Sequence, residues 1–240
     1  MSNFPYGSQQ QQPAWISGST ADVAERERSF IRSVYGWMFG GLMLTAGSAL
    51  WVVMSESMRQ LIFGNRAMMW ILLLAELGLV FFLSARVTKM SAAAAASAFL
   101  VYSVLSGLTL SVIFFVYTQG AIFQAFVTAG GMFAAMSIYG LVTKRDLTSW
   151  GSFFFMGLIG VLLCMVVNIF LRSSMLSFAA SLIGVIVFVG LTAYDTQKLK
   201  AYATAPQLRE NLAIYGALAL YLDFVNLFLM LLRLFGGNRR

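Results

Sequence analysis

Seven apolar stretches dominate the sequence, and each is long enough to cross a membrane as a helix. A hydrocarbon core about 30 Å thick needs roughly 20 apolar residues in helical conformation. Short polar breaks separate the stretches, so consecutive helices are expected to run antiparallel. We therefore predict an all-α integral membrane protein, a seven-transmembrane-helix bundle over residues 29–236. The predicted spans are residues 29–54, 67–85, 92–116, 121–142, 150–171, 175–194 and 212–234.

Composition supports the membrane assignment and narrows the chemistry. Hydrophobic residues make up 60% of the chain and charged residues 10%, whereas soluble domains average about 45–50% and about 25%. A soluble fold of this size could not hide so much apolar surface. Histidine is absent and Cys164 is the single cysteine. This excludes a disulfide framework, a Cys/His zinc site and catalysis by a histidine base, so we predict neither an enzyme nor a bound cofactor.

The N-terminal residues 1–28 differ from the rest of the chain. Residues 1–20 are rich in Gln, Ser and Gly without an apolar period, which is typical of a disordered tail. A basic start followed by an apolar run and a cleavage site is missing, so the segment does not read as a signal peptide. Residues 21–32 carry clustered charges and are predicted to form an amphipathic lead-in to the first span.

The distribution of basic residues predicts the orientation of the bundle. With a cytoplasmic N-terminus, ten of the sixteen Lys and Arg residues fall in the cytoplasmic set, and six fall in the opposite set. Short cytoplasmic loops are enriched in Lys and Arg, so we place the N-terminus inside and the C-terminus outside. The net charge of +7 then reflects mainly the orientation of the chain in the membrane, and it does not indicate a nucleic-acid partner.

Five ionisable residues fall within or at the ends of the predicted spans, where charge is costly. Glu76 and Arg86 lie on the second span, and Asp223 and Arg233 lie on the seventh. Each pair is ten residues apart, which is about 15 Å along a helix. If the two helices are neighbours, an inner layer joins Arg86 and Asp223 with Asp195 at the inner end of the sixth span. An outer layer then joins Glu76 with Arg233. Both layers pair opposite charges, which lets such groups survive in a low-dielectric interior.

Structural roles compete with functional ones at each of these positions. Arg86 and Arg233 fit basic anchors at helix ends, and Asp195 fits a helix end that faces the cytoplasm. Asp223 lies about eleven residues into a span and by default faces the bundle interior as a functional group. Two carboxylates that meet in a dry site cannot both ionise cheaply, so they titrate as a unit. As a metal site Asp195 and Asp223 would bind Ca²⁺ weakly and transiently, because Ca²⁺ prefers 6–8 oxygen ligands.

Several segments resemble a known family. Residues 190–200 read GLTAYDTQKLK, and residues 219–236 read ALYLDFVNLFLMLLRLFG. SGLTLS at 106–111, and MSIYG at 136–140 followed by KRD at 144–146, are also similar. On these motifs the chain resembles the Bax inhibitor family, or transmembrane Bax inhibitor motif family, and especially its bacterial inner-membrane members. The resemblance covers about residues 35–236.

The resemblance implies a fold, a function and a set of residues. It implies a central helix surrounded by the others and a pH-sensitive cation leak, with Ca²⁺ as the expected ion. Asp195 and Asp223 take the positions of the proton-sensing aspartate pair, and Arg86 that of a neighbouring arginine. Glu76 and Arg233 take the positions of an outer latch.

Three other functions compete with the leak. Some bacterial relatives are described as modulators of a membrane-bound ATP-dependent protease, which would make this chain its regulator and partner. The Gln-rich tail would matter for that function, so deletion of residues 1–20 should abolish it and spare a leak. An intramembrane aspartyl protease is disfavoured because Gly-x-Gly-Asp and Pro-Ala-Leu segments are missing. A retinal pump is disfavoured because the seventh span contains no lysine for a Schiff base.

Overall fold

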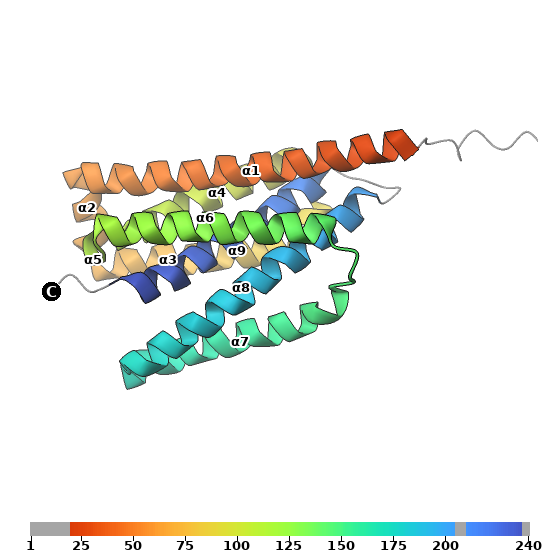
Figure 1. The fold of residues 1–240 in the computed structure, drawn as a ribbon. Coiled ribbons are helices and arrows are strands. Elements are labelled where there is room, and N and C mark those ends of the chain that lie inside the picture. Colours follow the sequence, from red (N-terminus) through yellow and green to blue (C-terminus); the bar gives the residue numbers. More distant parts are fainter. Residues whose placement is uncertain (1–19, 205–209, 237–240) are drawn as a thin grey trace, which may run out of the picture.

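A computed structural model describes residues 20–204 and 210–236, and this part of the chain is built from helices alone (Figure 1). Seven helical segments are long and apolar enough to cross a membrane, which confirms the predicted all-α seven-helix bundle. The elements are α1 Thr20–Met54, α2 Glu56–Phe63, α3 Arg66–Arg86, the 3₁₀ helix η1 Val87–Lys89, α4 Ala92–Leu110, α5 Ile113–Val116, α6 Gln119–Val142, α7 Thr148–Leu171, α8 Ser174–Ala203 and α9 Glu210–Phe235.

Polar residues in the short breaks start the helices. Five helices are preceded by a residue whose side chain accepts a hydrogen bond from a backbone N–H in the first turn. These N-cap residues are Ser55, Asn65, Ser91, Thr118 and Ser173. Such caps satisfy donors that would otherwise have no partner. The breaks that separate the apolar stretches therefore also fix where the next helix begins.

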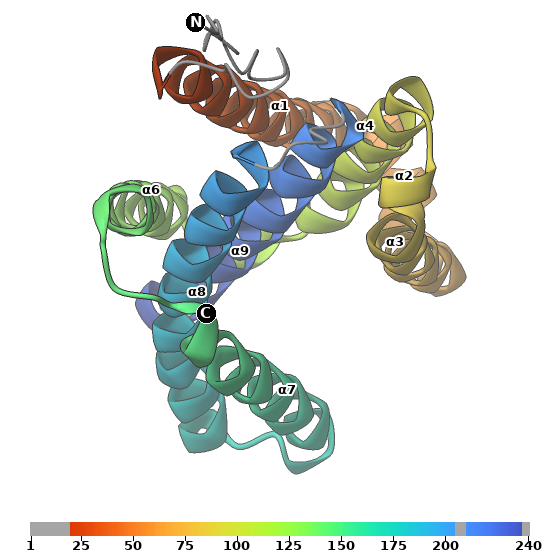
Figure 2. The ribbon, with the colours of Figure 1, turned by 90° about the vertical axis from the view of Figure 1, so that its right-hand side faces the viewer.

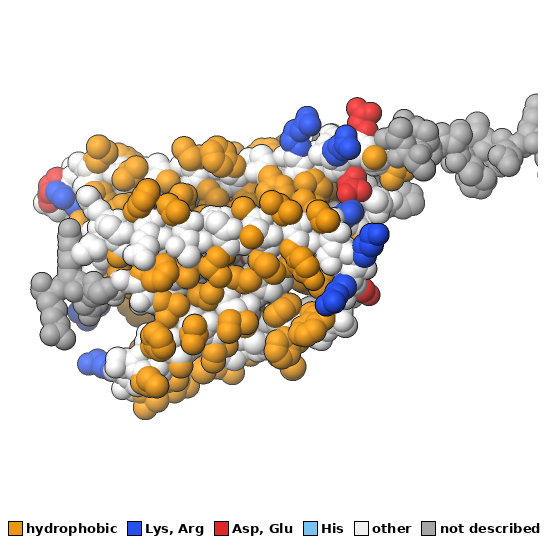
Figure 3. All heavy atoms as spheres, viewed as in Figure 1, with side chains coloured by type: hydrophobic (Ala, Val, Ile, Leu, Met, Phe, Trp, Pro, Cys, Tyr) orange, Lys and Arg blue, Asp and Glu red, His pale blue; other side chains and the backbone are white. Residues whose placement is uncertain are grey.

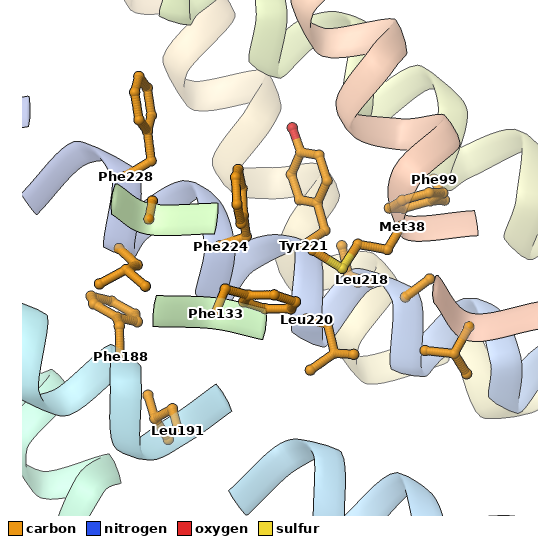
Figure 4. Packing of buried hydrophobic residues seen from close by; sticks show 14 of the residues in the cluster. Met38, Phe99, Phe133, Phe188, Leu191, Leu218, Leu220, Tyr221, Phe224 and Phe228 are labelled. Atoms are coloured by element: carbon orange, nitrogen blue, oxygen red, sulfur yellow. The ribbon is translucent and has the colours of Figure 1, made fainter. Parts of the chain in front are cut away.

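Helix α9 is the central helix of the bundle, as the family resemblance implies. It packs against α1, α4, α6 and α8 (Figure 2). Its Tyr221 ring packs edge-on against Phe99 of α4, with 5.8 Å between centroids, and Phe224 packs against Phe133 of α6 at 5.6 Å. Figure 4 shows Tyr221 and Phe224 on α9 among side chains from the surrounding helices, which include Phe99 and Phe133.

The peripheral helices α3 and α7, unlike α9, bury few of their side chains. Leu83 is the buried residue of α3, and Gly151 and Val161 are those of α7. Large apolar side chains cover the outer surface of the bundle (Figure 3). Lipid has to cover this surface, since water would not tolerate an apolar area of this extent.

Two boundaries differ from the sequence-based prediction. Helix α1 begins at Thr20, so residues 20–28 of the predicted tail are helical, while residues 1–19 lie outside the described part. Helix α8 continues to Ala203 because its buried face continues through Thr196, Leu199 and Ala203. Asp195 was placed at the end of a span, and it lies within a helix instead.

Basic side chains gather at one end of the bundle, where α1 starts and α3, α6 and α8 end (Figures 1 and 3). This end carries Arg26, Arg28, Arg32, Arg86, Lys89, Lys144, Arg145, Lys198 and Lys200, whereas Arg59, Arg66, Arg172 and Arg233 lie toward the other. We call the first the basic end. Its composition is that expected of a cytoplasmic face.

Candidate functional site: an aspartate pair in an intramembrane cavity

The packing of α8 on α9 brings Asp195 and Asp223 to one cavity of about 570 Å³. Side chains of α7, α8 and α9 line the cavity, and Ser84 contributes from the end of α3. Asp223 is 5% exposed, and Asp195 is partly buried. The two carboxyl groups line the same cavity and lie close enough for their charges to interact. The pair predicted from the sequence is thus assembled from two helices.

The hydrogen bonding of Asp223 is incomplete. Its Oδ2 atom is buried and has no hydrogen-bond partner in the part of the chain that the structure describes. A buried carboxylate without a donor is costly. Two carboxyl groups that share one proton remove part of this cost, because the protonated group donates to the ionised one. The geometry therefore suits a pair that holds a single proton.

The basic side chain near this pair belongs to Lys198. From the sequence, Lys198 was expected only as one of the basic residues of a cytoplasmic loop. Its Nζ atom lies 5.8 Å from the ring centroid of Tyr194, 5.9 Å from that of Tyr202 and 6.0 Å from that of Tyr215. Lys198 also lines the aspartate cavity. The spacing of Tyr194, Lys198 and Tyr202, four residues apart on one helix, was the signal that could have revealed this cluster.

The structure does not bring Arg86 to the aspartates. Arg86 is exposed in the last turn of α3, and within residues 20–204 and 210–236 it forms no ion pair. Ser84, two residues earlier, is the α3 residue that reaches the cavity. Two residues correspond to about 200° of rotation around a helix, so Arg86 points to the opposite side.

Glu76 and Arg233 do not contact each other in this structure, and each side chain has a partner elsewhere. The Glu76 Oε2 atom accepts a 2.7 Å hydrogen bond from the Thr109 hydroxyl of α4. Arg233 is exposed and lines a cavity of about 290 Å³ with Met165 and Asn168 of α7. Its Nη1 atom lies 3.1 Å from the Met165 sulfur. The predicted outer pair is therefore not formed in this arrangement of the helices.

A buried hydroxyl cluster links α9 to α1 and α4 on the side of α9 away from Asp223. The hydroxyls of Tyr221 and Thr45 are 2.7 Å apart. The Thr45 hydroxyl also lies 2.9 Å from the carbonyl oxygens of Gly41 and Ser103. Sequence reasoning missed this cluster, because single hydroxyl residues are common in apolar spans. Its hydrogen bonds fix the position of the central helix.

The aspartate pair offers few ligands to a metal ion. The described residues contain no group of three or more Asp, Glu, His or Cys side chains that could hold one. Two carboxyl groups fall well short of the 6–8 oxygens that Ca²⁺ prefers. A cation at Asp195 and Asp223 would complete its shell with water and backbone oxygens, and would bind weakly.

Comparison with known proteins identifies the family of this chain. A family model described as inhibitor of apoptosis-promoting Bax1 matches residues 27–240. The inner membrane protein YbhL of Escherichia coli is 51% identical over 217 residues, covering 88% of this chain and 93% of that protein. An uncharacterized protein of Deinococcus radiodurans is 42% identical over 228 residues, covering 94% of this chain and 96% of that protein.

The chain belongs to the Bax inhibitor family. The resemblance inferred from the sequence motifs is thereby confirmed, and the matched residues take in all seven candidate spans. As a Bax inhibitor family member it is a multi-pass membrane protein with an inner-membrane relative.

Proposed function

We propose that this protein is a cation leak of the bacterial inner membrane, with Ca²⁺ as the expected ion, gated by the protonation of Asp195 and Asp223. The observation that carries the proposal is the pair itself. Two carboxyl groups from different helices line one cavity of about 570 Å³, and the Oδ2 atom of Asp223 has no hydrogen-bond partner in the described chain.

A shared proton accounts for the closed state. While one proton is held between the two carboxyl groups, a hydrogen bond joins α8 to α9. When the proton leaves, two negative charges face each other in a site of low dielectric and repel strongly. Separation of the carboxylates loosens the contact between the helices, and the charges attract a cation. The chain contains no histidine, so carboxyl groups are the side chains left to sense pH near neutrality.

In this mechanism we take the observed packing of α8 on α9 as the closed state. Beyond the pair, toward the end of α9 that carries Arg233, the side chains of Leu227, Met230 and Leu231 are buried. These apolar residues disfavour the passage of a cation along this part of α9. Opening therefore requires α8 and α9 to move apart.

Flux measurements in proteoliposomes test the proposal. Wild-type protein should release Ca²⁺ faster as the pH rises, because deprotonation opens the pair. Asp195→Asn and Asp223→Asn should each flatten this dependence, since an amide cannot lose a proton in this range. Glu25→Gln, at an exposed position in the first turns of α1 that lines neither this cavity nor its entrance, is the control and should behave as wild type. Flux that is absent, or identical across pH in all four proteins, would refute the proposal.

A further inference from the structure

Lys198 occupies a cage of three tyrosines where two cavities meet. Tyr194 and Tyr202 come from α8, and Tyr215 comes from α9, so the cage spans both helices that carry the aspartates. The faces of aromatic rings attract cations within about 6 Å of the centroid. All three rings meet this limit, which makes the cage a site suited to a single positive charge.

The two cavities lie on either side of this cage. The aspartate cavity is lined by Tyr194 and Lys198, together with Asp195 and Asp223. A second cavity of about 450 Å³, at the basic end, is lined by the same Tyr194 and Lys198 and by the loop between α6 and α7. The side chains of Lys198 and Tyr194 therefore line both cavities and lie between them.

The loop that closes the second cavity is held in place by Gln197. Its Nε2 atom donates to the Arg145 carbonyl at 2.8 Å, and its Oε1 atom accepts from the Leu147 N–H at 2.8 Å. Both contacts start from the residue next to Lys198. The loop and the cage are thus fixed to the same turn of α8.

We propose that the Lys198 ammonium is a tethered cation that occupies the inner mouth of the aspartate cavity and blocks the entry of free cations. This inference rests on the proposed leak function, and it adds a second closure separate from the aspartate proton. Because Tyr194 and Lys198 line both cavities, an ion that moves from one to the other passes close to Nζ, where like charge repels it. Among the described residues Lys198 forms no salt bridge, so only the rings and the nearby charge of Asp195 hold it, and it can move aside.

A basic anchor at a helix end would not need such a cage. Tyr194 can occupy its position because Gly151 of α7 has no side chain. A Cβ atom on Gly151 would lie 2.6 Å from the Cε2 and Cζ atoms of the Tyr194 ring. Lys89, also at the basic end, is exposed and lines neither cavity, so it serves as the comparison for a simple anchor.

Cysteine substitution allows the charge to be removed and then restored. In a Cys164→Ser background, Lys198→Cys should raise Ca²⁺ flux about tenfold at a pH where wild type is nearly closed, because one repulsive charge is lost. A methanethiosulfonate reagent carrying a trimethylammonium group should bring the flux back down. The uncharged methyl reagent should leave it high. Lys198→Arg should keep the wild-type flux, and Lys89→Gln is the matched control.

The outcomes separate this inference from the function on which it rests. If wild-type flux depends on pH and on the aspartates, but Lys198→Cys and Lys198→Gln both match wild type, Lys198 is an anchor and the inference is wrong. Equal reversal by the charged and the uncharged reagent would also overturn it, since bulk and not charge would then close the mouth. If wild type carries no flux at any pH, the leak function itself fails, and the inference falls with it.

Discussion

At the scale of single residues, Asp223 is the least satisfied polar side chain on α9. It is 5% exposed, and its Oδ2 atom lacks a hydrogen-bond partner in the described residues. Evolution normally removes such a group unless it serves a function, because an unsatisfied buried polar atom costs about 1–3 kcal/mol. Stability and function should therefore be separable at this position.

Asp223→Leu tests this separation. Removal of the carboxyl group should leave the free energy of unfolding unchanged or raise it by about 1 kcal/mol, because the desolvation cost disappears. The adjoining cavity can take the extra volume of leucine. Thermal unfolding in detergent measures the change, alongside the pH dependence of flux, which should be lost. A marked fall in melting temperature would show that the carboxyl group stabilises the fold.

The Tyr221 hydroxyl, unlike the Asp223 carboxyl group, has a hydrogen-bond partner, the Thr45 hydroxyl, and should stabilise the fold. Tyr221→Phe should lower the free energy of unfolding by about 1 kcal/mol, the usual net value of one hydrogen bond. Thr45 keeps its carbonyl partners in this variant, so no buried group is orphaned. Thr45→Val should cost more, about 1–3 kcal/mol, because it leaves the Tyr221 hydroxyl without this partner. Thermal melts of the two variants in detergent would contradict this account if their order were reversed.

At the scale of elements, the close contact of α1 and α4 depends on Gly107. A Cβ atom at this position would overlap the Ser48 Oγ atom and the Thr45 carbonyl oxygen. Helices in membranes approach closely where small residues permit it. Gly107→Ala should therefore force α1 and α4 apart and cost about 1–3 kcal/mol, as overpacking does.

Gly47 is the matched control for Gly107. It lies on α1, and a Cβ atom there would meet nothing within 4 Å. Gly47→Ala should leave the melting temperature unchanged or raise it slightly, since alanine favours a helix over glycine. Equal effects of the two substitutions on thermal unfolding would contradict the packing argument.

The elements were largely predictable from the sequence, whereas the contacts between side chains were not. Each apolar stretch became a span, and Asp195 and Asp223 line one cavity, because apolar length and intramembrane charge are local signals. The end of α8 was placed too early, because Lys198 and Lys200 were taken for loop residues. The direction of Arg86 and the surroundings of Glu76 depend on helix rotation and packing, which no local pattern records.

At the scale of the whole molecule, the separation of charge between the two ends sets the orientation. The basic end carries the start of α1 and the loop between α6 and α7, and the opposite end carries α2 (Figure 1). Lys and Arg are retained on the cytoplasmic side during insertion. We therefore expect the loop containing Asp146 to lie in the cytoplasm and α2 to lie outside.

Cysteine labelling checks this orientation in intact cells. In a Cys164→Ser background, a cysteine at Glu56 should react with a membrane-impermeant maleimide added outside. A cysteine at Asp146 should react only after the membrane is permeabilised. Both positions are exposed in the structure, so a difference in labelling reports sidedness and not burial. The reverse pattern would place the basic end outside, and the tyrosine cage would then guard the outer mouth of the aspartate cavity.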